Sequence, residues 1–350
     1  MNKPVGISIN VFRRGGGMES YTFDLVRQFA AAGKRVRVYA SAFDETLPEY
    51  DLIEPVWIPQ KNIPKKLRPF WFARQLDKVR PANELLISCN AADNADVFIC
   101  GGNHLGYLQG MGQRTGLLDR LTIRRNRTNY QSARLIMAHS ELMQRELVGL
   151  YGVPSEKIRV LHPPADTARY HPDSESVAAL RAQYGFAADE TVFVFPSTGH
   201  KRKGLDMLAD FFEHTDLPVK LAVAGSPLPR PMRNVVELGF CKNMPELYRA
   251  ADYTIMASMY EPFGLVGVES VLCGTRVVLA DNMGCCEVLN DNAGFFFSRE
   301  NPATLARAVE QAVALKQQGA HKIGVPFEAL AYNPASPYHF QELRRMLGAD

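Results

Sequence analysis

The stretch Tyr253-Thr-Ile-Met-Ala-Ser-Met-Tyr-Glu-Pro-Phe-Gly-Leu-Val-Gly-Val-Glu-Ser-Val-Leu-Cys-Gly-Thr-Arg-Val-Val-Leu-Ala280 decides the fold. It opens with a short apolar run, Tyr253–Ala257, that predicts a buried strand, and it closes with a second such run, Arg276–Ala280. Between them, Gly264–Cys273 has the pattern of a helix. A helix that joins two apolar strands predicts a parallel pair, because parallel neighbours need a long crossover connection.

The same alternation of strand and helix continues along the rest of the chain. In the second half, strands are predicted at Thr191–Phe195, Lys220–Ala224, Val235–Leu238 and Gly294–Phe297, with helices from Leu205 and over Met244–Ala251 and Pro302–Gln318. In the first half, strands are predicted at Val5–Phe12, Arg35–Ala40, Leu85–Ser88, Val97–Cys100, Leu135–Ala138 and Ile158–Leu161, with helices over Met18–Ala32 and from an N-cap at Ser140 to Tyr151. Such alternation implies parallel sheets covered on both faces.

A proline-rich segment, His162–Pro172, separates the two halves. Its three prolines in eleven residues exclude a regular element, so we interpret it as a linker. The sequence therefore predicts an α/β protein with one domain over residues 1–165 and another over 166–335, separated by a cleft. A helical pattern within 336–350 is expected to cross back to the first domain. In folds of this kind, ligands bind at the carboxyl ends of the strands.

Length and composition fit a soluble two-domain enzyme. The chain has 350 residues, 46% of them apolar and 22% charged, and a net charge of +3, which does not suggest nucleic acid as a partner. None of its six cysteines lies in a C-x-x-C pair, so reduced thiols and a cytoplasmic location are expected. The N-terminal apolar run is short and ends in Arg13-Arg14, unlike a signal peptide, and no stretch approaches the length of a membrane-spanning helix.

Two glutamates bracket the start of the helix in the opening stretch. Glu261 lies in the preceding loop and Glu269 within the helix, and carboxylates accept hydrogen bonds from sugar or ribose hydroxyls. Between them, the N–H groups of Phe263, Gly264 and Leu265 lie at a helix N-terminus, which can bind phosphate. The segment therefore suits a nucleotide-sugar. An amphipathic helix with two solvent-facing glutamates would have the same spacing, so the pattern alone leaves both interpretations open.

Two other loops follow predicted strands. Pro196-Ser-Thr-Gly-His-Lys-Arg-Lys-Gly204 carries cations that can pair with a diphosphate, although a solvated charge run is the alternative. Gly15-Gly-Gly17 follows the first strand, where backbone can approach an anion closely; a tight turn without a ligand is the alternative. Ser20 stands where a dinucleotide fingerprint has its third glycine, which disfavours an oxidoreductase with such a cofactor.

Together these motifs resemble the family 4 glycosyltransferases, which are retaining enzymes with the GT-B fold of two Rossmann-like domains facing each other across a cleft. Glu261-x7-Glu269 fits their E-x7-E motif, Lys203-Gly204 their basic loop and Gly15-Gly16-Gly17-Met-Glu19 their first glycine loop. The resemblance covers residues 5–310 approximately and extends to two further stretches, Cys273–Val278 and Ala138–Val160. Within the family, the stretches Gly15–Leu25 and His200–Asp206 are most similar to enzymes of lipopolysaccharide core assembly.

The resemblance implies a role for each motif. Glu269 would bind the ribose hydroxyls, Glu261 would lie beside the transferred sugar, and a uridine base would lie at Phe240-Cys241. Arg202 and Lys203 would neutralise the departing diphosphate. The donor-binding residues expected on this basis are Gly16, Gly17, Phe240, Phe263, Gly264, Leu265 and Glu269, and the expected catalytic residues are Glu261, Lys203, Arg202 and His104.

Two histidines follow strands of the first half. His104, in Cys100-Gly-Gly-Asn-His104, is expected to contact the reacting sugar or the acceptor, with a capped loop histidine as the alternative. His139 precedes the capping Ser140 and could face the cleft. We find no Asp-x-Asp motif, so no metal and no other cofactor is expected: cationic side chains and helix N-termini would stabilise the departing group.

Two basic segments with interleaved apolar residues, 61–80 and 112–130, concern the acceptor. Such segments can lie on anionic lipid or bind an anionic glycolipid, while an amphipathic helix packed on its own domain is the alternative. The sequence thus predicts a glycan or glycolipid acceptor and a peripheral position on the inner face of the cell membrane. A sugar-nucleotide 2-epimerase of the same fold and a catalytically inactive nucleotide-sugar-binding module remain alternatives.

Three departures from the family pattern leave the donor sugar open. Ser197-Thr198 stands where many members have Gly-Arg, and Pro262 follows the first glutamate where glycine is common. The linker has His162-Pro-Pro-Ala-Asp166 where Asn-Gly-Val-Asp is usual.

Overall fold

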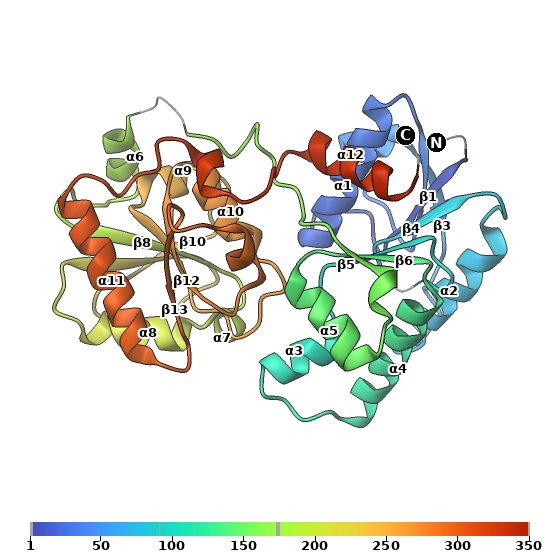
Figure 1. The fold of residues 1–350 in the computed structure, drawn as a ribbon, viewed down its shortest axis with the longest axis horizontal. Helices are drawn as coiled ribbons and strands as arrows, with labels where there is room; N and C mark the ends of the chain where they lie inside the picture. Colours follow the sequence, from blue (N-terminus) through green and yellow to red (C-terminus); the bar gives the residue numbers. More distant parts are fainter. Residues whose placement is uncertain (1–2, 91, 173–175, 349–350) are drawn as a thin grey trace. The chain divides into compact units, whose positions relative to one another are not determined.

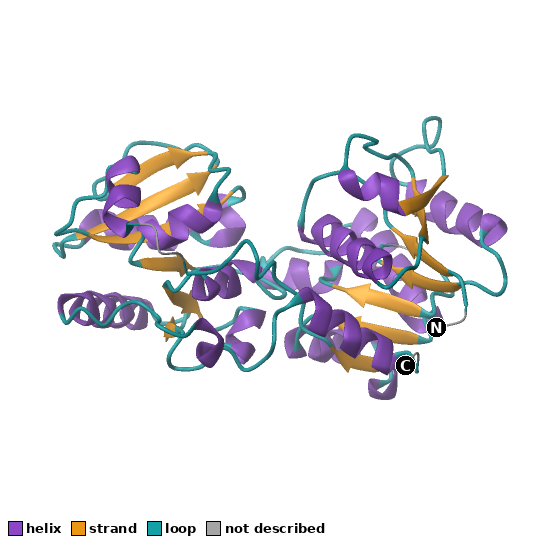
Figure 2. Ribbon diagram, turned by 90° about the horizontal axis from the view of Figure 1, so that it is seen from above, coloured by secondary structure: helices purple, strands orange, loops and turns teal. Residues whose placement is uncertain are grey.

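The computed structural model describes residues 3–90, 92–172 and 176–348. The chain forms two compact units: Met1–Pro164 together with Ala335–Asp350, called unit 1, and Ala165–Pro334, called unit 2. In each unit, helices cover a sheet of parallel strands (Figures 1 and 2). Within the described ranges, no helix combines the length and the apolar character needed to cross a membrane.

Unit 1 contains a seven-stranded sheet in the order β3-β2-β1-β4-β5-β6-β7. Its central strands are short apolar runs that are buried along their whole length, as expected for strands with helices on both faces. The strands are β1 (Val5–Ser8), β2 (Val36–Ala40), β3 (Ile53–Trp57), β4 (Leu85–Ser88), β5 (Val97–Cys100), β6 (Leu135–Ala138) and β7 (Ile158–Val160).

The helices of unit 1 come from both ends of the chain. Helix α12, after unit 2 in sequence, packs beside α1 (Figure 1), and the rings of Phe340 and Phe29 meet edge to face with centroids 4.8 Å apart. Leu343 is fully buried in the same core. The helices are α1 (Gly17–Ala31), α2 (Arg68–Val79), α3 (His104–Gly110), α4 (Leu117–Ser132), α5 (Glu141–Tyr151) and α12 (Ser336–Met346), with 3-10 turns η1 (Pro48–Leu52) and η2 (Ser155–Lys157).

Unit 2 contains a six-stranded sheet in the order β10-β9-β8-β11-β12-β13. The strands are β8 (Thr191–Ser197), β9 (Val219–Gly225), β10 (Val235–Gly239), β11 (Tyr253–Met256), β12 (Arg276–Ala280) and β13 (Gly294–Phe297). The helices are α6 (Val177–Gln183), α7 (His200–Lys203), α8 (Leu205–His214), α9 (Met244–Ala250), α10 (Leu265–Leu272) and α11 (Pro302–Gln317), with 3-10 turns η3 (Gly284–Val288) and η4 (Pro326–Ala329).

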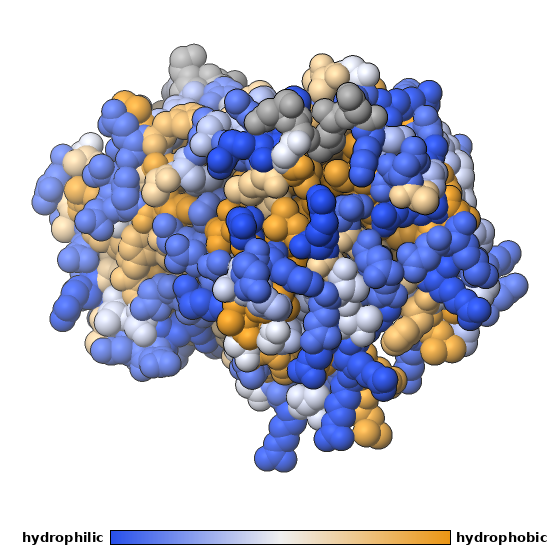
Figure 3. Space-filling view, turned by 45° about the vertical axis from the view of Figure 1, so that its right-hand side comes forward, coloured by the Kyte–Doolittle hydropathy of each residue, from blue (hydrophilic) through white to orange (hydrophobic). Residues whose placement is uncertain are grey.

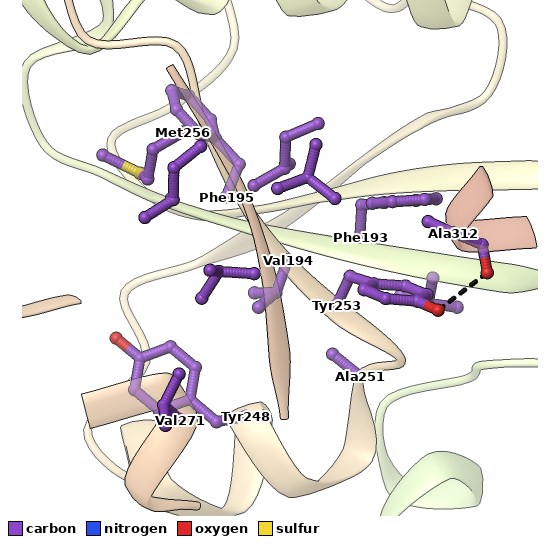
Figure 4. Packing of buried hydrophobic residues seen from close by; sticks show 14 of the residues in the cluster. Phe193, Val194, Phe195, Tyr248, Ala251, Tyr253, Met256, Val271 and Ala312 are labelled. Atoms are coloured by element: carbon purple, nitrogen blue, oxygen red, sulfur yellow. Dashed lines mark hydrogen bonds between the residues drawn. The ribbon is translucent and has the colours of Figure 1, made fainter. Parts of the chain in front are cut away.

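The core of unit 2 fixes β8 against β11. Figure 4 shows Tyr253 of β11 beside Phe193 of β8; their rings stack with centroids 5.2 Å apart. The Tyr253 hydroxyl donates a hydrogen bond of 2.7 Å to the carbonyl oxygen of Ala312, so its polar group is satisfied inside an apolar core. These contacts lock the position of the two strands whose loops carry the candidate site.

Several predicted elements have the bounds read from the sequence, including β4, β5, β6, β12 and β13. The strand predicted over Val5–Phe12 was too long, because the chain leaves the sheet after Ser8 and Phe12 forms an isolated bridge with Phe43. The loop predicted before Leu205 contains the short helix α7, which ends at Gly204 with a φ of 80°. Helix α6 was not predicted.

Candidate functional site

The topology of unit 2 brings two loops together. Strand order reverses between β8 and β11, and in parallel sheets the loops at such a switch point form ligand sites. The N–H group of Met259, after β11, donates a hydrogen bond of 2.8 Å to the carbonyl oxygen of Arg202 in α7. In return, Arg202 Nη1 donates to the carbonyl oxygen of Tyr260 at 3.0 Å. The predicted basic loop and the loop of the first glutamate are therefore one structure.

An ion pair joins the two loops through predicted catalytic residues. Arg202 Nη1 lies 2.8 Å from Glu261 Oε2, and both side chains are only partly exposed. The pair fixes the direction of the Glu261 carboxylate. Because a guanidinium has five N–H donors, Arg202 keeps others for a further anion.

Lys203 is a partly buried cation at this edge of the sheet, without an acidic partner among the described residues. Among the described residues, its ammonium group forms no ion pair or hydrogen bond, and the side chain is partly buried. Burial lowers the pKa of Lys203, while the negative charges of Glu261 and Glu269 raise it. A cation with little hydration and no partner is an electrostatic site for an anion.

Glu269 lies in the second turn of α10 and is held by tyrosines. The Tyr248 hydroxyl donates to Glu269 Oε2 at 3.4 Å. Burial raises the pKa of the Glu269 carboxyl, whereas hydrogen bonds from Tyr248 and Tyr170 and the charges of Arg169 and Lys203 lower it. Tyr248 and Tyr170, which the sequence analysis did not single out, thus orient the Glu269 carboxylate.

The N-terminus of α10 has the geometry of an anion site. Gly264 precedes the helix with a φ of 96°, and a Cβ there would lie 3.0 Å from both Glu261 Cγ and Met283 Cε, so only glycine fits. The N–H group of Leu265 begins the helix and has no carbonyl partner within the described hydrogen bonds. Phe263 contributes only backbone to this point, because its ring is buried near Tyr332.

Side chains from neighbouring loops also hold the carbonyl groups before Glu261. Asn282, just after β12, donates from Nδ2 to the carbonyl oxygens of Ser258 and Met259, at 3.1 Å each. Arg299, after β13, donates to the carbonyl oxygen of Ala257. The sequence analysis missed both residues, although each follows a predicted strand on the same side of β11.

Phe240 lies directly after β10 and is 76% exposed. An exposed aromatic ring at the carboxyl end of a strand is available for stacking, which is compatible with its predicted role at the base. Among the described residues, no contact joins Phe240 to Arg202 or Glu261. A bound ligand would have to reach from the ring to the ion pair.

In unit 1, the predicted glycines form the start of α1. Gly16 is the N-cap, and its N–H group donates to Glu19 Oε2 at 3.0 Å, which is the half of a capping box that a glycine can form. Gly17 is the first residue of the helix, and a Cβ there would meet no atom within 4 Å. Both glycines are exposed, so their N–H groups lie at an accessible helix N-terminus.

The two predicted histidines of unit 1 lie in different surroundings. His104 begins α3, not a loop, and its Nε2 lies 2.8 Å from Asp119 Oδ1. His139 is 6% exposed, its ring lies 4.9 Å from that of Tyr21, and its Nε2 has no hydrogen-bond partner. His104 thus stays partly accessible beside a carboxylate, whereas His139 is largely part of the core. No group of three His, Cys, Asp or Glu side chains within the described ranges is placed to hold a metal ion.

Sequence comparisons assign both halves of the chain to glycosyltransferases. Residues 15–169 match the family described as "Glycosyltransferase Family 4", and residues 176–324 match "Glycosyl transferases group 1". A protein of Burkholderia thailandensis named "Probable transglycosylase" is 42% identical over 345 residues, which cover 97% of this chain and 95% of that protein. The "D-inositol 3-phosphate glycosyltransferase" of Jonesia denitrificans is 30% identical over 209 residues, 52% of this chain and 49% of that enzyme.

Solved structures share the whole architecture at low sequence identity. WaaG, described as a glycosyltransferase involved in lipopolysaccharide biosynthesis, has a TM-score of 0.74 and 18% identity, with 99% of this chain and 95% of WaaG covered. HepE of Anabaena, solved with UDP and glucose, has a TM-score of 0.77 and 17% identity, with 100% of both chains covered. The chain therefore belongs to the family 4, group 1 glycosyltransferases and has their GT-B fold of two Rossmann-like domains.

Proposed function

We propose that this protein is a retaining hexosyltransferase that moves a hexose-type sugar from a UDP-sugar to a glycan or glycolipid acceptor. The observation that carries the proposal is the partly buried, unpaired ammonium of Lys203 at the switch point of unit 2. Holding such a charge away from water costs free energy unless an anion binds it. A nucleoside diphosphate supplies that anion.

Each predicted site residue has a part in this proposal. Lys203 and the N-terminus of α10 hold the diphosphate, and Arg202 orients Glu261 toward the sugar. Glu269, braced by Tyr248, accepts the ribose hydroxyls. Gly16 and Gly17 bind the diphosphate through the N-terminus of α1, the ring of Phe240 stacks on the base, and His104 contacts the sugar or the acceptor.

In the proposed step, the bond between the anomeric carbon and the β-phosphate oxygen breaks. The acceptor oxygen bonds to the same face of the sugar, and the acceptor proton passes to the departing phosphate oxygen. The negative charge that develops on that oxygen is stabilised by Lys203 and by helix N-termini. Because these groups supply positive charge from the protein, we propose that transfer needs no metal ion, and activity should persist in excess EDTA.

The proposed donor and pathway follow the solved relatives. HepE was solved with UDP-glucose, and WaaG is described as acting in lipopolysaccharide biosynthesis. We propose that this chain also uses a UDP-sugar and serves cell-surface polysaccharide synthesis. It would then work in the cytoplasm at the inner face of the membrane, with the basic segments 61–80 and 112–130 toward anionic lipid.

A matched pair of lysine variants tests the proposal. Lys203→Met should lower kcat by about two orders of magnitude or more, because one preorganised charge at the departing group is worth that much. Lys201→Met removes an exposed lysine of the same loop and should keep wild-type kcat. The measurement is UDP release from a panel of UDP-sugars with cell-envelope glycolipid. Wild-type turnover in Lys203→Met would refute the site.

The name of the Burkholderia relative suggests a second donor, a glycan in place of a nucleotide-sugar. The two donors differ in whether they need Lys203. The group that departs from a glycan donor is a neutral alcohol, whereas the group that departs from a nucleotide-sugar is a nucleoside diphosphate. Turnover of UDP-sugars that depends on Lys203 supports the first. Transfer from a glycan that is unchanged in Lys203→Met supports the second. Turnover of the donor without any acceptor would indicate an epimerase instead.

A further inference from the structure

Two cysteines stand side by side in a turn of unit 2 that packs on the loop of Glu261. Cys285 and Cys286 lie in η3, between β12 and β13 (Figure 1). Both are free thiols, and they are the only two cysteines that are neighbours in the sequence. Oxidation could therefore join these two sulfurs without bringing distant segments of the chain together.

Backbone hydrogen bonds tie this turn to the loop of Glu261. The N–H group of Gly284 donates to the carbonyl oxygen of Glu261 at 3.0 Å, and that of Cys285 donates to the carbonyl oxygen of Phe263 at 2.7 Å. A Cβ on Gly284 would collide with the carbonyl oxygen of Pro262, so the two backbones touch and only glycine fits. The backbone of η3 therefore cannot turn without disturbing the loop.

The Cys285 sulfur fills the space behind the first turn of α10. The residue is fully buried, and a Cβ added to Gly264 or to Gly267 would lie 3.4 Å or 3.0 Å from its sulfur, respectively. Because protein interiors are closely packed, moving this sulfur would leave a cavity beside both glycines. The N-terminus of α10, which is the candidate anion site, thus depends on where the Cys285 side chain lies.

Only one sulfur of the pair is accessible from water. Cys286 is partly exposed, and its thiol donates to the carbonyl oxygen of Ala280 at 3.4 Å, whereas Cys285 is 0% exposed. The hydrogen bond with Cys286 and burial raise the pKa of the Cys285 thiol, so it stays protonated beside its neighbour. Much of the face that Figure 3 presents is hydrophilic, and a soluble, charged oxidant can approach such a surface. An oxidant in the surrounding water therefore reacts first with Cys286.

We infer that Cys285 and Cys286 form a reversible disulfide, with a low-molecular-weight disulfide such as oxidised glutathione as the oxidant, and that this bond loosens the candidate anion site. The Cys286 thiolate attacks one sulfur of the oxidant, whose sulfur–sulfur bond breaks, and one half leaves as a thiol. Cys285 then attacks the Cys286 sulfur and releases the second half as a thiol. The protein gives up two electrons and two protons, and the oxidant becomes two thiols.

The spacing of neighbouring residues makes such a bond both disruptive and easy to reverse. Consecutive Cα atoms are about 3.8 Å apart, whereas the Cα atoms of disulfide partners are usually about 4.4–6.8 Å apart. The bond therefore requires a backbone that differs from the 3-10 turn in which the Cys285 N–H group reaches Phe263. Strained disulfides are easily reduced. Thiols in excess therefore keep the pair reduced, and the disulfide forms when the oxidant accumulates.

The coupling between the cysteine pair and the anion site must be reciprocal. A ligand that binds the reduced protein more tightly also makes the pair harder to oxidise, by the same factor. We expect UDP to bind about tenfold more weakly to the oxidised chain, and saturating UDP to lower the equilibrium constant for oxidation by glutathione disulfide about tenfold. The effect on UDP rests on the proposed function, whereas formation of the disulfide does not depend on it.

Mass spectrometry and hydrogen exchange test the disulfide without any ligand. In the full chain equilibrated with oxidised glutathione, the peptide that contains both cysteines should lose the mass of two hydrogen atoms, and excess dithiothreitol should restore it. The amide hydrogens of Gly284 and Cys285 should exchange at least about tenfold faster in the oxidised chain, because they bond to the loop of Glu261. A stable glutathione adduct on Cys286, an unchanged peptide mass, or a disulfide that leaves both amides protected would overturn the inference.

Matched variants locate the effect on UDP in calorimetry. Cys286→Ser keeps a donor toward Ala280 and removes the accessible sulfur, so its UDP affinity should be that of the reduced wild type, with or without oxidant. Cys89→Ser removes a thiol of unit 1 and should keep the full response to oxidant. An equal loss of affinity in Cys286→Ser would assign the effect to Cys241, the other partly exposed thiol of unit 2, and refute the pair. If the reduced wild type does not bind UDP, the proposed donor is wrong, and amide exchange alone decides whether the disulfide loosens the site.

Discussion

Acidification should destabilise unit 1 through two buried histidines. His139 and His339 are each less than a tenth exposed, and burial is the main cause that lowers the pKa of His139 to about 3 and that of His339 to about 4. Both values lie below the ordinary histidine value of about 6.5. The unfolded chain therefore takes up protons as the pH falls below 6.5, while the folded unit does not.

The size of the stability loss follows from the pH range between the unfolded and the folded pKa of each histidine. Each pH unit below 6.5 lowers the free energy of unfolding by about 1.4 kcal/mol per histidine, until the folded pKa is reached. At pH 5 the loss is about 2 kcal/mol for each histidine. Above about pH 7 both groups are neutral in both states, so neither contributes any pH dependence.

The two tryptophans make the assay specific. Trp57 and Trp71 both belong to unit 1, so their fluorescence follows the unfolding of that unit in urea. His139→Phe keeps an aromatic ring near Tyr21 and should lose about 2 kcal/mol less stability than the wild type between pH 7 and pH 5. His214→Gln, at an exposed site, should behave as the wild type. An equal loss in His139→Phe and wild type would refute the reasoning.

Three further substitutions have defined outcomes. Gly204→Ala forces a side chain into a φ of 80° and against the carbonyl oxygen of Ala257, and should lower the free energy of unfolding by about 2–4 kcal/mol in urea titration. Asn282→Ala frees two carbonyl groups before Glu261, the glutamate that we propose lies beside the sugar, and should lower kcat about tenfold with UDP affinity unchanged in calorimetry. Ser140→Ala removes the cap that accepts from Met143 N–H at 3.1 Å and should cost about 1 kcal/mol of stability, measured as a lower melting temperature.

The strands of this fold could be predicted because they are short, fully apolar runs. Val97–Cys100 and Leu135–Ala138 have no alternative pattern, and turn residues bound them. The N-cap at Ser140 could also be predicted, because it depends only on nearby residues: the Ser140 hydroxyl accepts from an N–H group three residues later. Helix α6 was missed although the equally short α9 was predicted, because α6 follows the proline-rich linker and no strand precedes it to complete the alternation of strand and helix.

The candidate site was harder to predict because its geometry depends on contacts between distant residues. The Arg202–Glu261 pair spans 59 positions, and Tyr248 reaches Glu269 across 21. The sequence shows which of these side chains are charged. The strand order was needed to show that their loops lie together. The resemblance predicted that Arg202 faces the diphosphate, and that remains a prediction. The structure adds that Arg202 Nη1 is bound to Glu261, while its other N–H donors are left for an anion.

The return of α12 to unit 1 sets the order in which this protein can be completed during synthesis. Unit 2 is one continuous segment, so all of its core residues are translated before α12. Phe340 and Leu343 fill the core of unit 1, which is the unit synthesised first. Domains usually finish folding from the N-terminus onward. Here the first unit to be translated must wait, with part of its core open, until the last one is finished.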